Sequence, residues 1–174
     1  MLRKHIVILE SFLEKLKGER IASILDAGSG GTSLSAIVKH FPGAKIDAVV
    51  YPGDQRKIRT ILPVREETGA DIQVLEKDIC HEPLCECYDL ITAHLLLGEA
   101  AKFGNRFETM LERLLAANFR YLIIIDYLED PVSMSRKFCG CAKNMGCKSL
   151  TGNVWKMNRP RFGRILQGYI TLDT

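Results

Sequence analysis

The sequence contains no hydrophobic run long enough to cross a membrane. Its longest apolar stretch, YLIIIDYL at 121–128, is interrupted by Asp126. The chain starts with basic residues followed by apolar ones, but Glu10 and Glu14 break the apolar core that a signal peptide needs. We therefore expect a cytoplasmic protein with no membrane partner.

A strong charge of either sign is also missing. The 24 lysine and arginine residues nearly balance the 21 acidic residues, which leaves a formal net charge of +3. Such a mild charge does not by itself predict a nucleic-acid partner. The 174 residues, 47% of them hydrophobic, can bury a sizeable core, and no repeat, low-complexity segment or linker divides them. A single domain over residues 1–174 is therefore expected.

Apolar segments with strand character alternate with amphipathic helical segments along the chain. This alternation predicts an α/β fold, a doubly wound and mostly parallel sheet with helices on both faces. We divide the domain into an N-terminal helix (1–19), a βα core (20–130) and a C-terminal part (131–174) with a helix and an antiparallel strand pair. The expected strands are 20–27, 44–51, 71–77, one within 88–97, 120–128, 149–158 and 163–173, and the expected helices are 2–17, 32–41, 54–64, 103–114 and 131–145.

One short segment, ILDAGSGGTS at 24–33, has the composition of a ligand-binding loop. Gly28 and Gly30 follow a strand and precede a helix, so a ligand can approach the backbone closely and meet free N–H groups at the helix start. A tight strand-to-helix turn without a ligand is the alternative. Asp26 favours a ligand with positive charge, because a carboxylate gains nothing beside the pyrophosphate of a nicotinamide dinucleotide. A nicotinamide-dependent reductase is therefore the less favoured interpretation.

The segment LDAGSGG (25–31) resembles the first motif of the class I S-adenosylmethionine-dependent methyltransferases. In that Rossmann-like family, the loop holds the methionine end of the cofactor, which implies that Asp26, Gly28, Ser29 and Gly30 bind S-adenosylmethionine. The resemblance also implies a seven-stranded sheet whose last strand is antiparallel. It extends over residues 20–174, although Thr32 stands where the family has a third glycine.

The resemblance assigns further cofactor contacts to the ends of the next two strands. The family's ribose-binding acid is missing, because its place falls at Val50 or Tyr51. Asp54 is the candidate replacement on the ribose, and Tyr51 is a candidate for packing on the cofactor. The position of Asp78 implies that it accepts from the adenine amino group, and Ile79 would lie against the ring. A helix cap or turn is the alternative role of Asp78.

The methyl acceptor is expected above the ends of the first, fourth and fifth strands. His94, which could also touch the cofactor, is the candidate base because a free imidazole titrates near neutral pH; a structural histidine is the alternative. Asp126, at the end of the fifth strand, is the second candidate catalytic residue. No Asn/Asp-Pro-Pro-Tyr segment follows the fourth strand, so the usual signature for methylating a DNA base is absent. The acceptor is therefore not identified. Little sequence is inserted beyond the core, so the alternatives are a large acceptor that covers the site, a second subunit as in a homodimer, or an open site.

Two other features leave alternatives open. The missing ribose acid favours a binding domain that has lost catalysis. The basic residues near the end of the chain, interleaved with Trp155 and Phe162, could form an RNA-binding face, although a solvated surface is the simpler interpretation. They are Arg136, Lys137, Lys143, Lys148, Lys156, Arg159, Arg161 and Arg164.

The six cysteines form two groups, which are Cys80, Cys85 and Cys87, and Cys139, Cys141 and Cys147. A disulfide framework is not expected in a reducing compartment. Zinc would need ligands from both groups, and the usual strand order places them on opposite sides of the sheet centre. No metal is therefore predicted.

Overall fold

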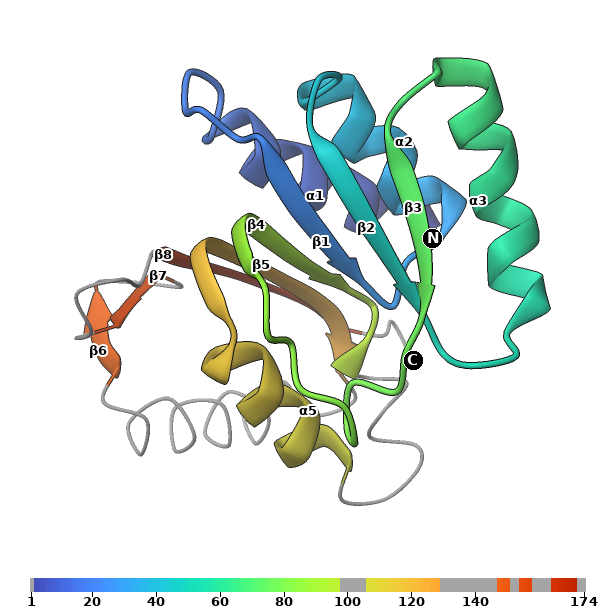
Figure 1. The fold of residues 1–174 in the computed structure, drawn as a ribbon. Helices are drawn as coiled ribbons and strands as arrows, with labels where there is room; N and C mark the ends of the chain where they lie inside the picture. The colour runs from blue at the N-terminus through green and yellow to red at the C-terminus, as the bar shows by residue number, and fades with distance from the viewer. Residues whose placement is uncertain (1, 98–105, 129–146, 151–153, 158–163, 172–174) are drawn as a thin grey trace.

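One twisted sheet of eight strands, in the order β3-β2-β1-β4-β5-β8-β7-β6, organises the chain (Figure 1). The computed structural model describes residues 2–97, 106–128, 147–150, 154–157 and 164–171, with side chains described for 5–97 and 108–126. The strands are β1 (Ser23–Ala27), β2 (Lys45–Val50), β3 (Ile72–Glu76), β4 (Cys87–His94), β5 (Asn118–Leu128), β6 (Cys147–Leu150), β7 (Val154–Met157) and β8 (Arg164–Thr171). The helices are α1 (Leu2–Glu14), α2 (Gly31–His40), α3 (Gln55–Thr68) and α5 (Arg106–Ala116).

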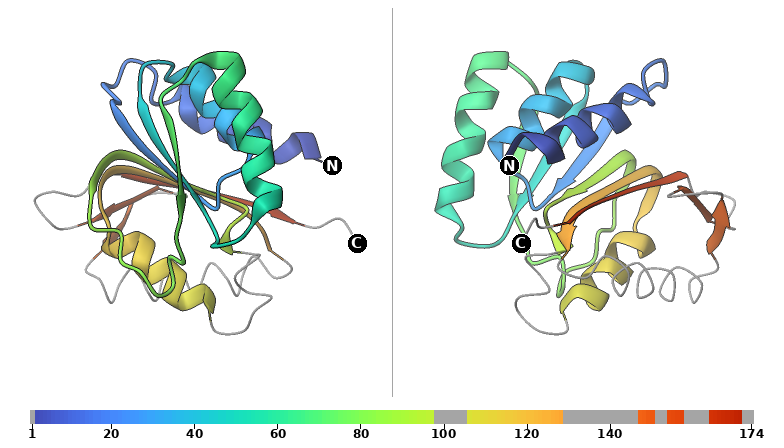
Figure 2. Two further views of the ribbon diagram at one scale, coloured as in Figure 1. Left: turned by 45° about the vertical axis from the view of Figure 1, so that its right-hand side comes forward. Right: turned by 180° about the vertical axis from the view of Figure 1, so that it is seen from behind.

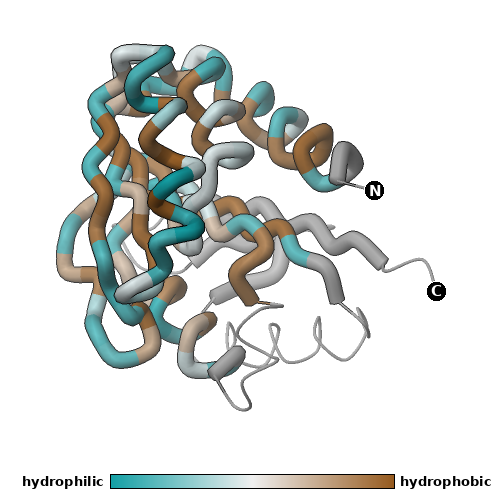
Figure 3. Tube along the Cα trace, turned by 90° about the vertical axis from the view of Figure 1, so that its right-hand side faces the viewer, coloured by the Kyte–Doolittle hydropathy of each residue, from teal (hydrophilic) through white to brown (hydrophobic). Residues whose placement is uncertain are grey.

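The two faces of the sheet carry separate hydrophobic cores. One core packs α1, α2 and α3 against strand residues that include Ile24 and Leu90. The other packs α5 against the alternate strand residues, such as Leu25 and Ile91. Figure 2 shows α5 on the opposite side of the sheet from the three other helices, and Figure 3 shows hydrophobic positions concentrated on the strands between them. The prediction of an α/β sheet with helices on both faces is confirmed.

Strands β3, β2, β1, β4 and β5 all run parallel. Their carboxyl ends therefore meet at one edge of the sheet, which is where open parallel sheets bind ligands. The central strand β1 lies between β2 and β4, and the loop after it leads directly into α2. This topology places the glycine segment in the middle of the ligand-binding edge.

The end of the sheet differs from the prediction. We expected seven strands with an antiparallel last strand, but the described residues form eight, and β8 runs parallel to β5. The expected terminal antiparallel pair does form between β7 and β8. The reversal arises because the expected strand 149–158 is divided into β6 and β7, which pair antiparallel with each other. The chain therefore reverses direction once more than expected, and this makes β8 parallel to β5. The helix expected at 131–145 lies outside the described residues.

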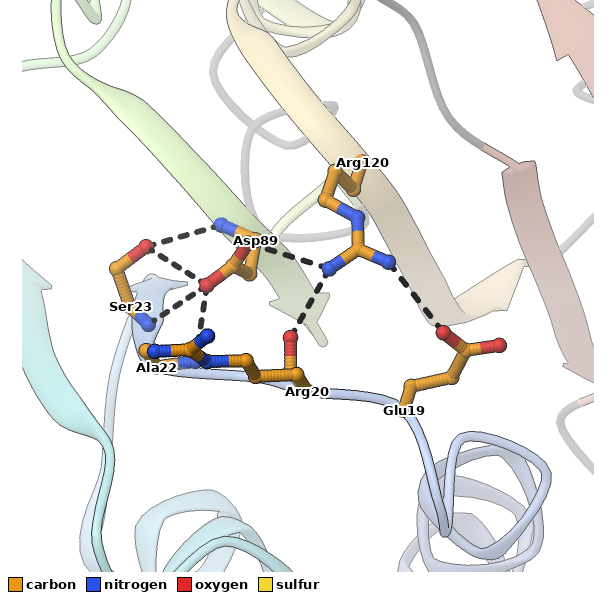
Figure 4. A network of polar contacts seen from close by, with 6 residues as sticks. All are labelled: Glu19, Arg20, Ala22, Ser23, Asp89 and Arg120. Atoms are coloured by element: carbon orange, nitrogen blue, oxygen red, sulfur yellow. Dashed lines mark hydrogen bonds and ion pairs between the residues drawn. The ribbon is translucent and has the colours of Figure 1, made fainter.

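At the opposite edge, a polar network ties the starts of β1, β4 and β5 together (Figure 4). Asp89 accepts hydrogen bonds from the backbone N–H groups of Ala22, at 2.9 Å, and Ser23, at 3.2 Å. Arg120 lies 3.5 Å from the Asp89 carboxylate and donates to the Arg20 carbonyl at 2.9 Å. Burial alone would raise the pKa of Asp89, but these N–H groups and the Arg120 charge hold it below its usual value. This network fixes the strands at the edge away from the glycine loop.

None of the helices in the described part of the chain has the length and hydropathy that a membrane span requires.

Candidate functional site

The glycine loop turns sharply between β1 and α2. Gly28 has φ of 73°, in the left-handed region that favours glycine, whereas Gly30 is extended with φ of −159°. The Ser29 N–H donates to the Val49 carbonyl at 2.8 Å, which fastens the loop to β2. Helix α2 begins at Gly31. The sequence therefore predicted this strand–loop–helix unit correctly.

Asp26 organises the loop from beneath. Its carboxylate is fully buried and accepts hydrogen bonds from the hydroxyls of Ser29 at 2.6 Å, Ser33 at 2.8 Å and Thr92 at 2.6 Å. Burial raises the pKa of Asp26, and the three hydroxyls and the charge of Lys57 oppose that rise. The acid thereby joins β1, α2 and β4 around the loop. Direct contact of Asp26 and Ser29 with a cofactor stays a prediction.

The three glycines of the loop have different surroundings. A Cβ at Gly28 would come within 2.7 Å of the Leu96 side chain. A Cβ at Gly31 would come within 2.3 Å of the Thr60 carbonyl oxygen, so this glycine allows α2 and α3 to pack closely. The nearest atom to a Cβ at Gly30 is 3.9 Å away. Gly30 is therefore the one of these three glycines at which a Cβ would make only an ordinary van der Waals contact, with the Thr60 hydroxyl.

Lys57 reaches the loop from α3, and the sequence analysis missed it. Its ammonium donates to the Gly28 carbonyl at 2.7 Å. The available signal was the charge of the first turn of α3, which contains Arg56 and Lys57 and no acidic residue. Cations are unfavourable at a helix N-terminus, so this pattern indicates a role other than helix stability.

The loop after β2 contains the candidate ribose residue Asp54 and Tyr51, the candidate for packing on the cofactor. Tyr51 is 55% exposed, and the Asp54 carboxylate caps α3 by accepting from the Lys57 N–H at 3.1 Å. A second carboxylate, Glu76 at the end of β3, accepts from the Gly53 N–H at 2.7 Å. The roles of Tyr51 and Asp54 toward a cofactor stay predictions.

The candidate adenine residues lie in the loop after β3. The Asp78 carboxylate accepts from the Cys80 N–H at 3.0 Å and lies 2.9 Å from the His81 ring nitrogen Nδ1. These contacts are those of a turn residue, which was the alternative role. Ile79 is 3% exposed and packs in the core beneath α5. The structure thus gives both residues a role in the loop itself, and their contact with adenine stays a prediction.

His94, at the end of β4, pairs with His5 of α1. The His5 Nδ1 and His94 Nε2 atoms are 2.7 Å apart, and both side chains are buried. Burial, together with the neighbouring His5 and Lys57, lowers the pKa of His94 to about 4. The next residue, Leu95, has φ of 58°, a strained conformation of a kind that clusters at functional sites. His94 is therefore a neutral, enclosed imidazole at neutral pH.

The two candidate catalytic residues are not brought together. His94 pairs in register with Ile125, whose side chain lies in the core beneath α1 and α2. Asp126 follows Ile125 directly and therefore points to the other face, because strand side chains alternate. It is 2% exposed. The two side chains therefore lie on opposite faces of the sheet, and the catalytic role of each stays a prediction.

No group of three or more His, Cys, Asp or Glu residues in the described part of the chain is placed to hold a metal ion. Cys80 is buried, and Cys85 and Cys87 are exposed. The side chains of the second cysteine group and of the C-terminal basic residues lie outside those described.

Comparisons with known proteins agree with this architecture. No protein-family model and no curated protein sequence matches the chain. A methyltransferase from Aquifex aeolicus that depends on S-adenosylmethionine has a similar structure, with a TM-score of 0.62 and 20% identity over 87% of this chain and 85% of its own. A mitomycin 7-O-methyltransferase is similar with a TM-score of 0.59 and 16% identity over 82% of this chain.

A Burkholderia thailandensis 1,6-didemethyltoxoflavin N1-methyltransferase, solved with S-adenosylhomocysteine bound, has a TM-score of 0.52 and 15% identity over 94% of this chain and 62% of its own. The present chain spans 48% of the length of the mitomycin enzyme. At these identities the likeness concerns the fold. The chain has the fold of the class I S-adenosylmethionine-dependent methyltransferases.

Proposed function

We propose that the protein binds S-adenosylmethionine at the glycine loop and transfers its methyl group to an acceptor held above the carboxyl ends of β4 and β5. The observation that carries this proposal is the loop between β1 and α2, which lies at the ligand-binding edge of a methyltransferase fold. Gly28 is left-handed, and a Cβ at Gly30 would make only an ordinary van der Waals contact, with the Thr60 hydroxyl. A loop of this shape lets a ligand contact the backbone.

The residues around the loop fit the two ends of this cofactor. Its methionine end carries both an ammonium and a carboxylate, and the loop is flanked by the buried acid Asp26 and the ammonium of Lys57. Tyr51, Asp54, Asp78 and Ile79 are proposed for the adenosine end on the basis of the family resemblance. When bound, the cofactor supplies an electrophilic methyl group on its sulfonium.

The surroundings of His94 limit the chemistry that the protein itself can contribute. An imidazole whose pKa is about 4 stays neutral at neutral pH, but it is a weak general base, because proton transfer works best when the pKa lies near the working pH. We therefore propose an acceptor that offers a free lone pair or ionises easily. The rate enhancement then comes mainly from alignment of the acceptor with the methyl group.

Isothermal titration calorimetry with S-adenosylmethionine, S-adenosylhomocysteine and NAD tests the binding step. We expect S-adenosylmethionine and S-adenosylhomocysteine to bind with dissociation constants in the micromolar range, a binding free energy of about 8 kcal/mol. We expect NAD not to bind. Binding of NAD alone would contradict the proposal and support the reductase alternative. Binding of the sulfur ligands without transfer to any acceptor in a panel would favour the binding domain without catalysis.

A further inference from the structure

We infer that Lys57 is a ligand-binding residue whose ammonium, seated on the Gly28 carbonyl, takes the carboxylate of the amino-acid end of the ligand. This inference rests on the proposed function, because it concerns the same loop and the same ligand. It adds a cationic contact that neither the sequence motif nor the comparisons assign.

The position of Lys57 fixes its charge at the loop. The 2.7 Å hydrogen bond to the Gly28 carbonyl spans 29 positions of sequence and links α3 to the turn after β1. The side chain is half-buried, so its ammonium is partly shielded from water. An ammonium has three N–H donors, and the Gly28 carbonyl is its one partner among the described residues. Two donors thus remain for a ligand at the glycine loop.

The placement of Lys57 in α3 is unfavourable for the helix itself. Asp54 is the N-cap, so Lys57 occupies the first turn, where the helix dipole favours acidic side chains. Arg56 stands in the same turn, and the Asp54 cap is the one acid at this end of the helix. Local rules of this kind are most often broken at functional sites. The charge of Lys57 is therefore better explained by what it meets at the loop.

An acidic residue lies beneath the glycine loop and a cationic residue lies beside it. Asp26 lies two residues before Gly28 and is fully buried, whereas the Lys57 ammonium is bound to Gly28 itself. The positive charge of Lys57 lowers the pKa of Asp26, against the effect of burial. The same charge lowers the pKa of His94, in addition to the effect of burial. The ammonium therefore lies near both residues. An amino-acid zwitterion carries the complementary pair of charges. One acidic and one cationic group on the two sides of the glycine turn suit such a ligand end.

The test removes the charge from the protein and from the ligand in turn. Wild type and Lys57→Met are titrated calorimetrically with S-adenosylhomocysteine and with its decarboxylated analogue, in which hydrogen replaces the α-carboxylate. We expect Lys57→Met to weaken binding of S-adenosylhomocysteine about ten- to hundredfold, as for loss of a charged hydrogen bond. It should change binding of the analogue by about twofold or less. Equal losses for both ligands, or no loss for either, overturn the inference.

Arg56→Met is the matched control, since it removes an exposed cation from the same helical turn. It should leave both affinities unchanged, and an effect equal to that of Lys57→Met would overturn the inference. Titration of His94 by NMR without any ligand gives a second readout. The pKa of His94 should rise in Lys57→Met, because the nearby ammonium of Lys57 is lost, and it should not rise in Arg56→Met. An unchanged pKa of His94 in Lys57→Met overturns the inference and leaves the proposed function intact. If the wild-type protein binds neither S-adenosylmethionine nor S-adenosylhomocysteine, both the inference and the proposed function are overturned.

Discussion

His5 and His94 share one short contact, 2.7 Å between Nδ1 and Nε2, although 89 positions separate them in the sequence. One of the two nitrogens must carry the proton and the other must accept it, since two protonated nitrogens would repel at this distance. Burial lowers the pKa of both imidazoles. The pair thus joins α1 to the end of β4 only while at least one ring is neutral.

This pairing predicts a loss of stability in mild acid. The unfolded chain takes up a proton at His94 near pH 6.5, whereas the folded chain does so near pH 4. The stabilisation is therefore complete above pH 6.5 and is lost as the pH falls from 6.5 toward 4. We expect urea denaturation to show a decrease of roughly 2 kcal/mol between pH 7.5 and pH 5.

His94→Gln should reduce this pH dependence, because one of the two buried imidazoles is gone. The control is His81→Gln, whose side chain is 70% exposed and which should keep the wild-type slope. A His94→Gln protein that retains the full slope would show that another group causes it.

The two neighbouring glycines of the loop should respond differently to alanine. Gly30→Ala adds a Cβ that clashes with no protein atom, at an extended φ, so the melting temperature should hardly change. Binding of S-adenosylhomocysteine should weaken by about tenfold or more, roughly 1.4 kcal/mol. Gly31→Ala pushes a Cβ against the Thr60 carbonyl and should cost about 1–3 kcal/mol of stability. Thermal unfolding and calorimetry measure the two effects. A folded Gly30→Ala protein with wild-type affinity would move the binding site elsewhere.

Asp54 has a structural role that can be separated from its proposed ribose contact. Asp54→Ala removes the cap of α3 and should lower stability by about 1 kcal/mol, whereas Asp54→Asn keeps a capping oxygen and should lower it less. If Asp54 also accepts from the ribose, Asp54→Ala weakens binding of S-adenosylmethionine far more than binding of its 2′,3′-dideoxy analogue. Equal losses for the two ligands would remove Asp54 from the ribose.

The network at the far edge should affect stability and not binding. Asp89→Ala leaves two backbone N–H groups and Arg120 without their shared acceptor, so unfolding should become easier by about 1–3 kcal/mol. Because the pKa of Asp89 is lowered, its contribution is present above the unfolded pKa and disappears as the pH falls through the folded value. Glu19→Gln breaks only an exposed ion pair with Arg120 and should cost less than about 1 kcal/mol. Loss of cofactor affinity in Asp89→Ala would contradict this separation of the two edges.

The parts of the fold that were predicted correctly depend on local patterns. The continuous apolar run at 120–128 is typical of a strand buried on both faces. The amphipathic spacing of α5 is typical of a helix buried on one face. The direction of β8 does not depend on a local pattern. It depends on whether residues 149–158 form one strand or two. That division is decided by pairing with a neighbour, and a single sequence does not contain it.

The candidate site shows the same distinction. The loop from Asp26 to Gly30 was recognisable because its residues are adjacent. His5 stands four residues before Leu9, on the buried stripe of α1, so its burial could have been expected. The pairing of His5 with His94 could not have been expected from the sequence. The contact between Lys57 and Gly28 likewise depends on how α3 packs beside the loop.

The attachment of Arg120 to the Arg20 carbonyl has a consequence for synthesis of the chain. Arg120 is made 100 residues after Arg20, and at about 5–20 residues per second this means a delay of roughly 5–20 seconds. Until β4 and β5 follow, one side of β1 has no strand beside it and the buried face of α1 lacks the strand that it covers. We therefore expect part of the apolar surface of α1 and β1 to stay exposed until β4 and β5 are made. A nascent chain stalled before β5 should bind a general chaperone, and release should coincide with the appearance of Arg120.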